Sequence, residues 1–545
     1  MNRNRTLILL LMLLSVLLMS LPFLVPHCGW AALVGLAPLL SAERLAAQEG
    51  RKHFWWWHYG AFVLWNAITT WWVCNATVGG GIFAVLANAL QMSLIFGLFR
   101  WVKRRLSGVI PYLFLAAAWI AWEKYYLTVA EISWPWLVLG NAFADTTSLV
   151  QWYEYLGTLG GSLWVWASNL AVFGIMVALS KGCFLRWNLK ARTAAIGGAV
   201  LAVFGPMIWS LCLFGREEVP TGQARVVIAQ PNIDPYNKRG GMDQDTQAAI
   251  LLDLFRQGLK GEEGPVLLVG PETFTNYLQV GAYENHKTWL RFRSFLQEHP
   301  EAQLLCGAST YTVSVGKRPS PNAYVYHSNA WVEGHNSAFL MDSTGRTDIY
   351  HKSKLVPGVE FLPYVGVLGP IDDKYLGGVS GRNVGQKEVS LLHWTPDGAD
   401  IPVGCAVCYE SVYGEYCTRY VLKGARLLSV ITNDAWWGDT PGYGQHLNYS
   451  RLRAIETRRD IARCANTGVS ALIDARGHIV DRTPWWEPAV LKGTLNLYDR
   501  KTFFVRYGDI TGRLSVFVFA LLLLAALVQG LKSRQAPRQH RKAAR

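Results

Sequence analysis

Three short apolar runs in this chain each lead to a side chain that could take part in nucleophilic chemistry. A carboxylate can accept the thiol proton of a cysteine, and an ammonium can stabilise the oxyanion that forms when the thiolate attacks a carbonyl. A Glu, a Lys and a Cys held together would therefore form a nucleophile site. The runs and the residues that follow them are 266–269 with Glu272, 337–341 with Lys352, and 403–407 with Cys408.

Each of these residues also has an ordinary structural explanation. Cys408 could be a core cysteine, since free Cys is among the most buried residue types. Glu272 could cap a helix, whose N-terminus favours acids, and Lys352 could be a solvated charge in a basic segment. The three are 80 and 56 positions apart, so their spacing alone does not bring them together.

The elements that would position these residues lie between about Gly222 and Asp499, where the chain has the pattern of an α/β domain. Residues 247–259 repeat apolar side chains on one helical face, and 342–345 and 474–477 favour tight turns between paired strands. Strands mixed with helices and hairpins predict a layered α/β sandwich, with chemistry at the carboxyl edge of a sheet. Seven apolar runs have strand length: 226–229, 266–269, 303–307, 337–341, 403–407, 427–432 and 469–473.

The rest of the chain is dominated by apolar runs of about 20 residues, the length that crosses a bilayer. The first run could be a secretory signal. It is longer than a usual signal core and further apolar runs follow, so we interpret it as a retained span. The eight predicted spans are 6–23, 30–47, 54–73, 80–99, 109–129, 157–179, 194–214 and 514–531.

Lys and Arg lie on one side of these predicted spans. They occur at the N-terminus, after the second, fourth and sixth spans and in the C-terminal tail, whereas the loops near Pro26 and Asn75 and residues 130–154 contain none. The positive-inside rule then places both termini in the cytoplasm and the α/β domain outside. The net charge of +14 is concentrated beside apolar runs, which favours a membrane and argues against nucleic acid.

The cysteine pattern predicts no metal site, and we expect no cofactor. Nine cysteines are scattered singly apart from the Cys405-x-x-Cys408 pair, and no second pair or His-x-His cluster completes a zinc site. An external compartment is oxidising, so Cys408 must avoid pairing with Cys405. Three positions apart on one strand, the two side chains would point to opposite faces.

The order of the motifs resembles the nitrilase superfamily, whose sites use Glu, Lys and Cys. Seven spans before such a domain and one after it are similar to the apolipoprotein N-acyltransferases of bacterial envelopes. Each motif alone is weak, but together with the topology they cover essentially the whole chain. The matching stretches are 271–273 (Pro-Glu-Thr), 350–357 (Tyr-x-Lys-x-x-Leu-Val-Pro), 408–410 (Cys-Tyr-Glu), 228–232, 433–438, 454–459, 466–468 and 502–509.

The resemblance implies that Cys408 is the nucleophile, Glu272 the general base and Lys352 the oxyanion stabiliser. It also implies a supporting or substrate-binding role for four further residues: Glu360, a second carboxylate; Tyr409 and Glu410, next to the nucleophile; and Trp436, on a loop near the acyl site.

Two positions depart from the commoner family pattern. Lys354 stands where a His is usual, and Pro-Gly-Val-Glu at 357–360 replaces Pro-Phe-Gly-Glu. The spacing of eight between Lys352 and Glu360 is kept, so we retain Glu360 as a candidate.

The implied reaction moves an acyl chain in two steps. Cys408 takes it from a phospholipid, phosphatidylethanolamine in the family, and the thioester passes it to the α-amine of the N-terminal S-diacylglyceryl cysteine of an apolipoprotein. This is the last step of lipoprotein maturation. The enzyme would be a monomeric, multi-pass protein of the bacterial inner membrane, with its catalytic domain on the periplasmic side.

The expected fold is thus an α-helical membrane domain plus a nitrilase-like αββα sandwich. The expected division is a seven-span domain (1–215), the catalytic domain (222–499), a connector (500–513), the last span (514–531) and a basic cytoplasmic tail (532–545).

Two other functions fit parts of the sequence. A membrane-tethered amidase of the nitrilase type would use the same three residues on a soluble substrate, but one span would suffice to anchor it. A transporter with an accessory domain would need ionisable residues within its spans, and few are present.

Overall fold

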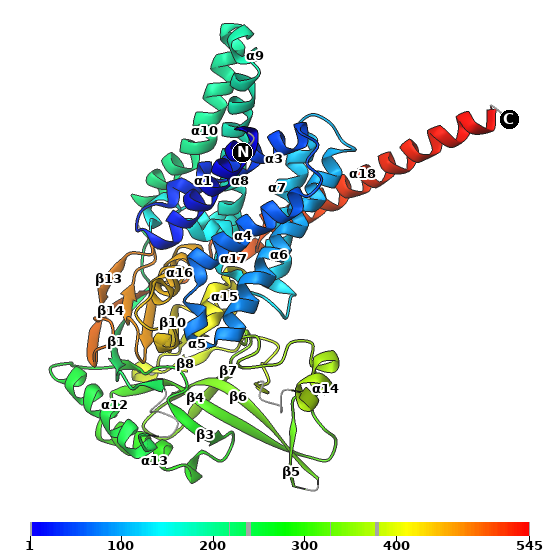
Figure 1. Ribbon diagram of the computed structural model, residues 1–545. Coiled ribbons are helices and arrows are strands. Elements are labelled where there is room, and N and C mark those ends of the chain that lie inside the picture. Colours follow the sequence, from blue (N-terminus) through cyan, green and yellow to red (C-terminus); the bar gives the residue numbers. More distant parts are fainter. Residues whose placement is uncertain (1–2, 217, 236–240, 328, 376–380, 544–545) are drawn as a thin grey trace. The chain divides into compact units, whose positions relative to one another are not determined.

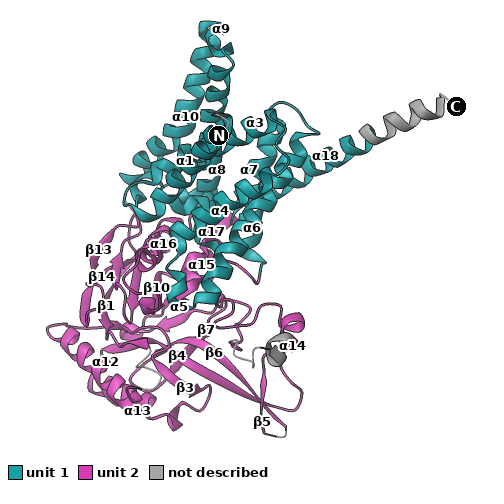
Figure 2. Ribbon diagram, in the orientation of Figure 1, with its two compact units in different colours: residues 1–130, 134–215, 509–545 teal, residues 131–133, 216–508 magenta. Residues whose placement is uncertain are grey.

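A computed structural model describes residues 3–216, 218–235, 241–327, 329–375 and 381–543 (Figure 1). The chain divides into two compact units (Figure 2): unit 1 holds residues 1–130, 134–215 and 509–545, and unit 2 holds residues 131–133 and 216–508.

Unit 1 is helical. Large apolar side chains stay exposed on its helices, such as Leu17 at 60% and Leu201 at 70%, as on a surface that faces lipid rather than water. Its helices are α1 (Arg3–Leu24), α2 (Ala32–Gly35), α3 (Ala37–Gln48), α4 (Phe54–Thr70), α5 (Val73–Ala76), α6 (Val78–Lys103), α7 (Ile110–Thr128), α8 (Tyr153–Ser180), α9 (Cys183–Arg186), α10 (Leu189–Phe214) and α18 (Ile510–Ala543).

Among the described residues, six helical segments are long and apolar enough to cross a membrane. The predicted spans at 54–73 and 109–129 are also helical, as α4 and α7, but are not among the six. The 17 residues of α4 are few for a crossing, and Glu123 and Lys124 lower the hydropathy of α7. The count of eight therefore stays a prediction. The six segments are Asn4–Leu24, Gly29–Gln48, Val78–Lys103, Tyr153–Ser180, Leu189–Phe214 and Ile510–Lys532.

One predicted span, 30–47, is broken between α2 and α3. Asn169 on α8 provides hydrogen-bond partners for the backbone groups that this break leaves free. Its Oδ1 accepts hydrogen bonds from the backbone N–H groups of Leu36 (2.7 Å) and Ala37 (2.9 Å), and its Nδ2 donates to the Ala32 carbonyl (2.7 Å). A helix break in an apolar bundle persists only where its free backbone groups are satisfied in this way.

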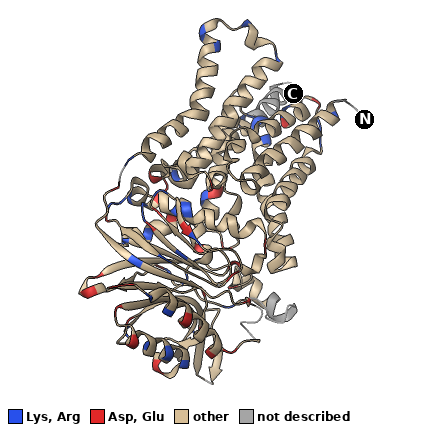
Figure 3. Ribbon diagram, turned by 90° about the vertical axis from the view of Figure 1, so that its left-hand side faces the viewer, with Lys and Arg blue, Asp and Glu red and all other residues tan. Residues whose placement is uncertain are grey.

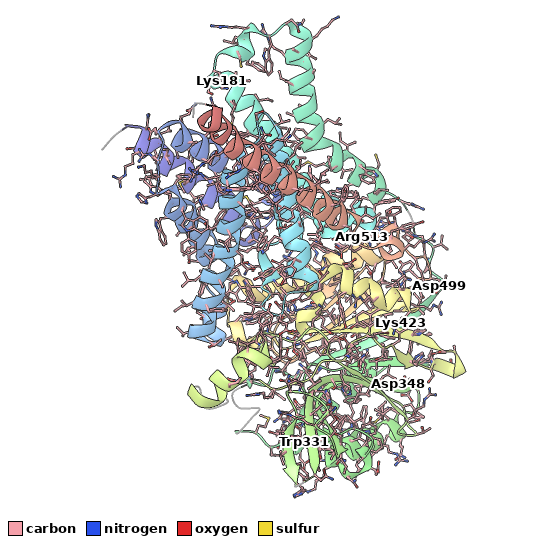
Figure 4. All side chains as sticks on the ribbon, turned by 90° about the vertical axis from the view of Figure 1, so that its right-hand side faces the viewer. Lys181, Trp331, Asp348, Lys423, Asp499 and Arg513 are labelled. Atoms are coloured by element: carbon pink, nitrogen blue, oxygen red, sulfur yellow. The ribbon has the colours of Figure 1, made fainter. Side chains whose placement is uncertain are left out.

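Basic residues gather at the turn that joins α8 to α10 (Figure 3), an end of unit 1 that Figure 4 marks with Lys181. The turn carries Lys181, Arg186, Lys190 and Arg192.

Unit 2 contains two β-sheets. The eight-stranded sheet has the order β14-β1-β2-β4-β6-β5, with β3 beside β4 and β7 beside β6; the six-stranded sheet has the order β13-β12-β11-β10-β9-β8. The strands are β1 (Gly222–Gln230), β2 (Val266–Val269), β3 (Thr275–Gln279), β4 (Ala302–Val315), β5 (Tyr324–His327), β6 (Ala330–Met341), β7 (Thr347–His351), β8 (Leu392–Trp394), β9 (Ile401–Val407), β10 (Leu427–Thr432), β11 (Ile461–Ala465), β12 (Ala471–Ile473), β13 (Ile479–Arg482) and β14 (Ala489–Leu497).

Helices cover the outer face of each sheet. Leu251 and Phe255 of α12 and Phe292 of α13 pack in one core with Val227 and Leu304 of the first sheet. On the second sheet the Tyr420 hydroxyl of α15 donates to the Cys405 carbonyl (2.9 Å). The helices of unit 2 are α12 (Gln244–Leu259), α13 (Lys287–Glu298), α14 (Val365–Tyr375), α15 (Gly414–Leu422), α16 (Pro441–Thr457) and α17 (Phe503–Tyr507).

The other faces of the two sheets meet each other. The Cys464 thiol of β11 donates to the Ala229 carbonyl of β1 (3.3 Å), and the Asn466 amide donates to the Ile233 carbonyl (2.7 Å). Helix, sheet, sheet and helix are stacked in that order, which confirms the predicted αββα sandwich.

Candidate active site

Glu272 follows β2 at a place where two backbones come unusually close. A Cβ built on Gly307 of β4 would lie 2.6 Å from the Glu272 Cα and 2.7 Å from the Pro271 carbonyl oxygen, so only glycine fits there. The Gly307 N–H donates to the Pro271 carbonyl (3.0 Å) and its carbonyl accepts from Phe274 N–H (2.9 Å). Glycine in β4 thus fixes the segment that carries the Glu272 carboxylate.

Lys352 is positioned by the β6–β7 hairpin, which turns at Gly345 in a left-handed conformation (φ 91°). Ser337 pairs with His351, and the Lys352 N–H donates to the Asn336 carbonyl (2.7 Å). Asn336 and Lys352 are therefore neighbours across the hairpin.

Four side chains form one closed hydrogen-bonded cluster here. Lys352 Nζ lies 3.2 Å from Glu272 Oε1 and 2.9 Å from Glu360 Oε2. Asn336 Nδ2 donates to Glu272 Oε1 (2.8 Å) and to Glu360 Oε1 (2.6 Å). Two donors thus separate two carboxylates that would otherwise repel each other.

The charge state of Lys352 follows from this cluster, because its side chain is only 1% exposed. Burial lowers the pKa of the Lys352 ammonium, but Glu360 and Glu272 together raise it above its usual value. The two carboxylates thus favour the charged form of this buried lysine.

Glu360 reaches the cluster despite the altered loop sequence. Gly358 turns in a left-handed conformation (φ 79°), and the Glu360 N–H donates to the Val356 carbonyl (2.9 Å). The Val356 N–H in turn donates to Glu360 Oε2 (2.7 Å). A glycine turn one position earlier than in the commoner pattern therefore still aims this carboxylate at Lys352.

Cys408 stands at the carboxyl end of β9, as the first residue of the short helix η7 (Cys408–Val412). Burial raises the pKa of the Cys408 thiol, the Glu272 carboxylate raises it further, and the Lys352 ammonium lowers it. The thiol therefore lies within electrostatic range of both charged candidates, and it is protonated at neutral pH until a base removes its proton.

Glu410 is fully buried and has its own set of hydrogen-bond donors. Its Oε1 accepts hydrogen bonds from the Tyr350 hydroxyl (2.6 Å) and from the backbone N–H groups of Ser353 (2.7 Å) and Lys354 (3.1 Å); its Oε2 accepts from the Val407 N–H (2.8 Å). Glu410 therefore ties the end of β9 to the segment that follows Lys352.

The other predicted residues line the same edge of the domain. The Tyr409 hydroxyl donates to the Ser133 carbonyl (2.8 Å). The Lys354 ammonium lies 5.3 Å from the centre of the Tyr413 ring. Trp436 is half-buried in the short helix η8 (Asp434–Trp437), directly after β10, the strand beside β9.

Cys405 and Cys408 are both free thiols, as are the other seven cysteines. Cys405 is buried in β9, and burial raises the pKa of its thiol well above the usual range. The strand ends at Val407 and Cys408 adopts φ 52°, so the predicted alternation along one strand does not extend to Cys408.

A thiol, a carboxylate and a buried ammonium can together supply the nucleophile, the base and the oxyanion partner of an acyl transfer. In the part of the chain that the structure describes, no group of three or more His, Cys, Asp or Glu side chains could hold a metal ion. Asn336 is the one cluster member that sequence reasoning missed. Its only signal is its hairpin register with Lys352, which requires the strand pairing.

Comparison with known proteins identifies the family of the chain. Residues 225–502 match the carbon-nitrogen hydrolase family, and residues 15–171 match the apolipoprotein N-acyltransferase N-terminal domain. An apolipoprotein N-acyltransferase of Chlorobaculum tepidum is 29% identical over 508 residues, 92% of each chain, and one of Azotobacter vinelandii is 30% identical over 83% of this chain and 82% of that one. An amidase from Nesterenkonia sp. covers 52% of this chain and 92% of its own at 18% identity, with a TM-score of 0.35.

Proposed function

Because the chain belongs to the apolipoprotein N-acyltransferase family, we propose that it moves an acyl chain from a phospholipid to the α-amine of an apolipoprotein's N-terminal S-diacylglyceryl cysteine. The main observation in support of this proposal is the ion pair of Glu272 and Lys352, because both charged groups shift the pKa of the Cys408 thiol. The domain that holds it is preceded and followed in the chain by helices of membrane-spanning length.

In the first step the Glu272 carboxylate takes the thiol proton of Cys408, and the thiolate attacks the ester carbonyl of the phospholipid. The Lys352 ammonium stabilises the tetrahedral oxyanion. Collapse of this intermediate breaks the C–O bond, Glu272 returns the proton to the leaving alkoxide, and a lyso-phospholipid departs. The acyl group remains on Cys408 as a thioester.

In the second step the α-amine of the apolipoprotein cysteine attacks the thioester carbonyl. Glu272 accepts a proton from the amine, and Lys352 again stabilises the oxyanion. The C–S bond breaks, the amide product leaves, and the sulfur of Cys408 regains its proton from Glu272. The acid, the base and the nucleophile all return to their starting states without any cofactor, as a two-step exchange at one site requires.

The remaining predicted residues would support this chemistry. Glu360, with Asn336, holds the Lys352 ammonium in place, and Glu410 holds the Cys408 turn against the Lys352 segment. We assign Tyr409 and Trp436, on the same edge, to substrate binding.

A membrane setting suits both substrates, because each keeps acyl chains in a bilayer. Withdrawing such chains into water costs about 0.8 kcal/mol per CH₂. We propose phosphatidylethanolamine as the donor, with acyl transfer from its sn-1 position. We also propose that a monomer works in the bacterial inner membrane, with residues 222–499 on the periplasmic side between the seven-span part (1–215) and the last span.

Intact-protein mass spectrometry after incubation with phosphatidylethanolamine vesicles tests the proposal. We expect one acyl adduct, on Cys408, that disappears when an S-diacylglyceryl peptide is added. Cys408→Ser should form no adduct, whereas Cys405→Ala, a matched change three residues earlier, should form it at the normal rate. An adduct on another cysteine, or hydrolysis of soluble amides without any adduct from lipid, would refute the proposed function.

A further inference from the structure

Buried polar side chains contact the backbone of Cys408, and the reaction described above does not use them. Cys408 has φ 52°, a left-handed conformation that costs a non-glycine residue of order 1–3 kcal/mol and persists only where the surroundings enforce it. Two side chains meet the carbonyl oxygen of this residue. The Ser411 hydroxyl donates to it at 2.8 Å, and His446 Nε2 lies 3.1 Å from it.

His446 belongs to α16, and its other nitrogen faces a buried ion pair. Its Nδ1 lies 2.9 Å from Asp434 Oδ1, and Arg463 Nη2 lies 2.7 Å from Asp434 Oδ2. The side chains of these three residues are 0% exposed. Although burial would raise the pKa of Asp434, Arg463 and His446 hold it well below its usual range, so the carboxylate is charged.

The two nitrogens of His446 face different partners. A carboxylate can only accept, so Nδ1 donates to Asp434. Nε2 lies 3.1 Å from the Cys408 carbonyl oxygen and 3.0 Å from the Ser411 hydroxyl oxygen, so His446 and Ser411 hold that carbonyl as one hydrogen-bonded group. Arg463 Nη2 lies 3.3 Å from Nδ1, and its shorter contact is with Asp434.

We infer that His446 is a positioning residue that, backed by Asp434 and Arg463, fixes the peptide unit between Cys408 and Tyr409. Because a peptide unit is planar and trans, holding the Cys408 carbonyl on one side also fixes the direction of the Tyr409 N–H on the other. A backbone N–H directly after a nucleophile is a natural second oxyanion donor, and here it would act together with Lys352. This inference rests on the proposed function only for the identity of the acyl donor.

Three substitutions of His446 separate this role from simple packing. His446→Gln keeps an N–H donor near the position of Nε2, His446→Asn keeps one only near Nδ1, and His446→Phe keeps ring volume without a donor. Loss of an oxyanion donor typically costs about 10²–10³-fold. We therefore expect single-turnover acylation of Cys408 to fall at least about tenfold in His446→Asn and His446→Phe, and to stay within about threefold in His446→Gln.

Two further readouts distinguish positioning from collapse of the site. The KM for the acyl donor should not change, because His446 touches no substrate. Alkylation of Cys408 by iodoacetamide, which forms no oxyanion, should stay within about threefold in all three variants, since the loss concerns oxyanion stabilisation. The matched control is His393→Gln, which breaks the exposed His393–Asp400 pair (2.8 Å) and should change neither rate.

Acylation is measured both with phosphatidylethanolamine vesicles and with a p-nitrophenyl acyl ester. Acylation by the ester but not by the lipid would refute the proposed donor and still test His446. The inference is wrong if His446→Phe acylates at a near-normal rate, or if His446→Gln does no better than His446→Asn. If the His446 variants do not fold, Ser411→Ala provides the test, because it removes the other donor to the same carbonyl. Unchanged acylation in Ser411→Ala overturns the inference. A lower kcat with an unchanged KM supports it.

Discussion

At the scale of single residues, the site consists of charged side chains that are buried out of contact with water. Glu272, Glu360 and Lys352 are largely buried, and each carboxylate shares the ammonium and the Asn336 amide. Breaking a buried ion pair leaves an uncompensated charge that costs several kcal/mol. The cluster therefore acts as one unit. The roles of its members are best distinguished by the effect of each one on the pKa of the Cys408 thiol.

Replacing the base and replacing the ammonium should have opposite effects on the pH dependence of acylation. Burial raises the pKa of the Cys408 thiol, Glu272 raises it further and Lys352 lowers it. Glu272→Gln removes the base but also lowers the pKa of Cys408, so its acylation rate, reduced about 10²–10⁴-fold at neutral pH, should recover partly as pH rises. Lys352→Met raises the pKa of Cys408 and removes the oxyanion partner, so it should show no such recovery.

Single-turnover acylation against pH for the two variants measures this difference, with thermal unfolding as a control that both still fold. Parallel profiles, with neither variant recovering, would mean that the base and oxyanion roles are assigned wrongly.

At the scale of elements, the site depends on how strand ends are tied to one another. Glu410 joins the end of β9 to the segment after β7, and Gly307 of β4 holds the segment after β2. A similar tie spans the two sheets at Asp460. Its Oδ1 accepts from the Ala475 N–H (2.8 Å) and its Oδ2 from the Asn496 N–H of β14 (2.7 Å).

The Asp460 tie should make the domain less stable as pH rises. Burial raises the pKa of Asp460 to about 7, against about 3.9 in an unfolded chain. The folded state therefore retains a proton that the unfolded state has lost. The resulting stability is present below about pH 4, declines as pH rises toward 7 and levels off above it.

Thermal unfolding in detergent between pH 5 and pH 8 checks this prediction. Asp460→Asn cannot ionise, so its Tm should fall less over this range than that of the unaltered protein. Asp253→Asn, a change at an exposed carboxylate of α12, should keep the normal slope. Equal slopes in all three proteins would contradict the Asp460 assignment.

At the scale of the whole molecule, the chain alternates between apolar and polar environments. Helices of spanning length both precede and follow unit 2 in the sequence, and the lysines and arginines of unit 1 cluster at turns such as 181–192. The energetic cost of moving such charges across a bilayer determines which side each loop occupies.

Cysteine labelling in intact cells tests the expected topology. In a background where the exposed Cys212 is replaced by Ser, Lys423→Cys, in unit 2, should react with an impermeant maleimide from outside. Lys181→Cys should react only after the inner membrane is opened. Figure 4 marks both positions. The reverse pattern would place the domain in the cytoplasm and exclude the periplasmic setting of the proposed reaction.

Much of the fold was predictable because apolar runs mark buried strands. The runs 266–269 and 427–432 have the same bounds as β2 and β10. Strands that continue through polar residues were underestimated: the predicted 303–307 lies within β4, which has 14 residues. The strand β11 was not predicted, because Arg463 interrupts its apolar run.

The sequence by itself determined which residue types follow which strands, and its motif order pointed to Glu272, Lys352 and Cys408 and to the family. Only the tertiary structure decided how they are arranged. The contact of Asn336 with two carboxylates follows from hairpin register, and that of His446 with the Cys408 carbonyl follows from packing α16 on the sheet. Such contacts join residues tens of positions apart, and local patterns of hydrophobicity contain no information about them.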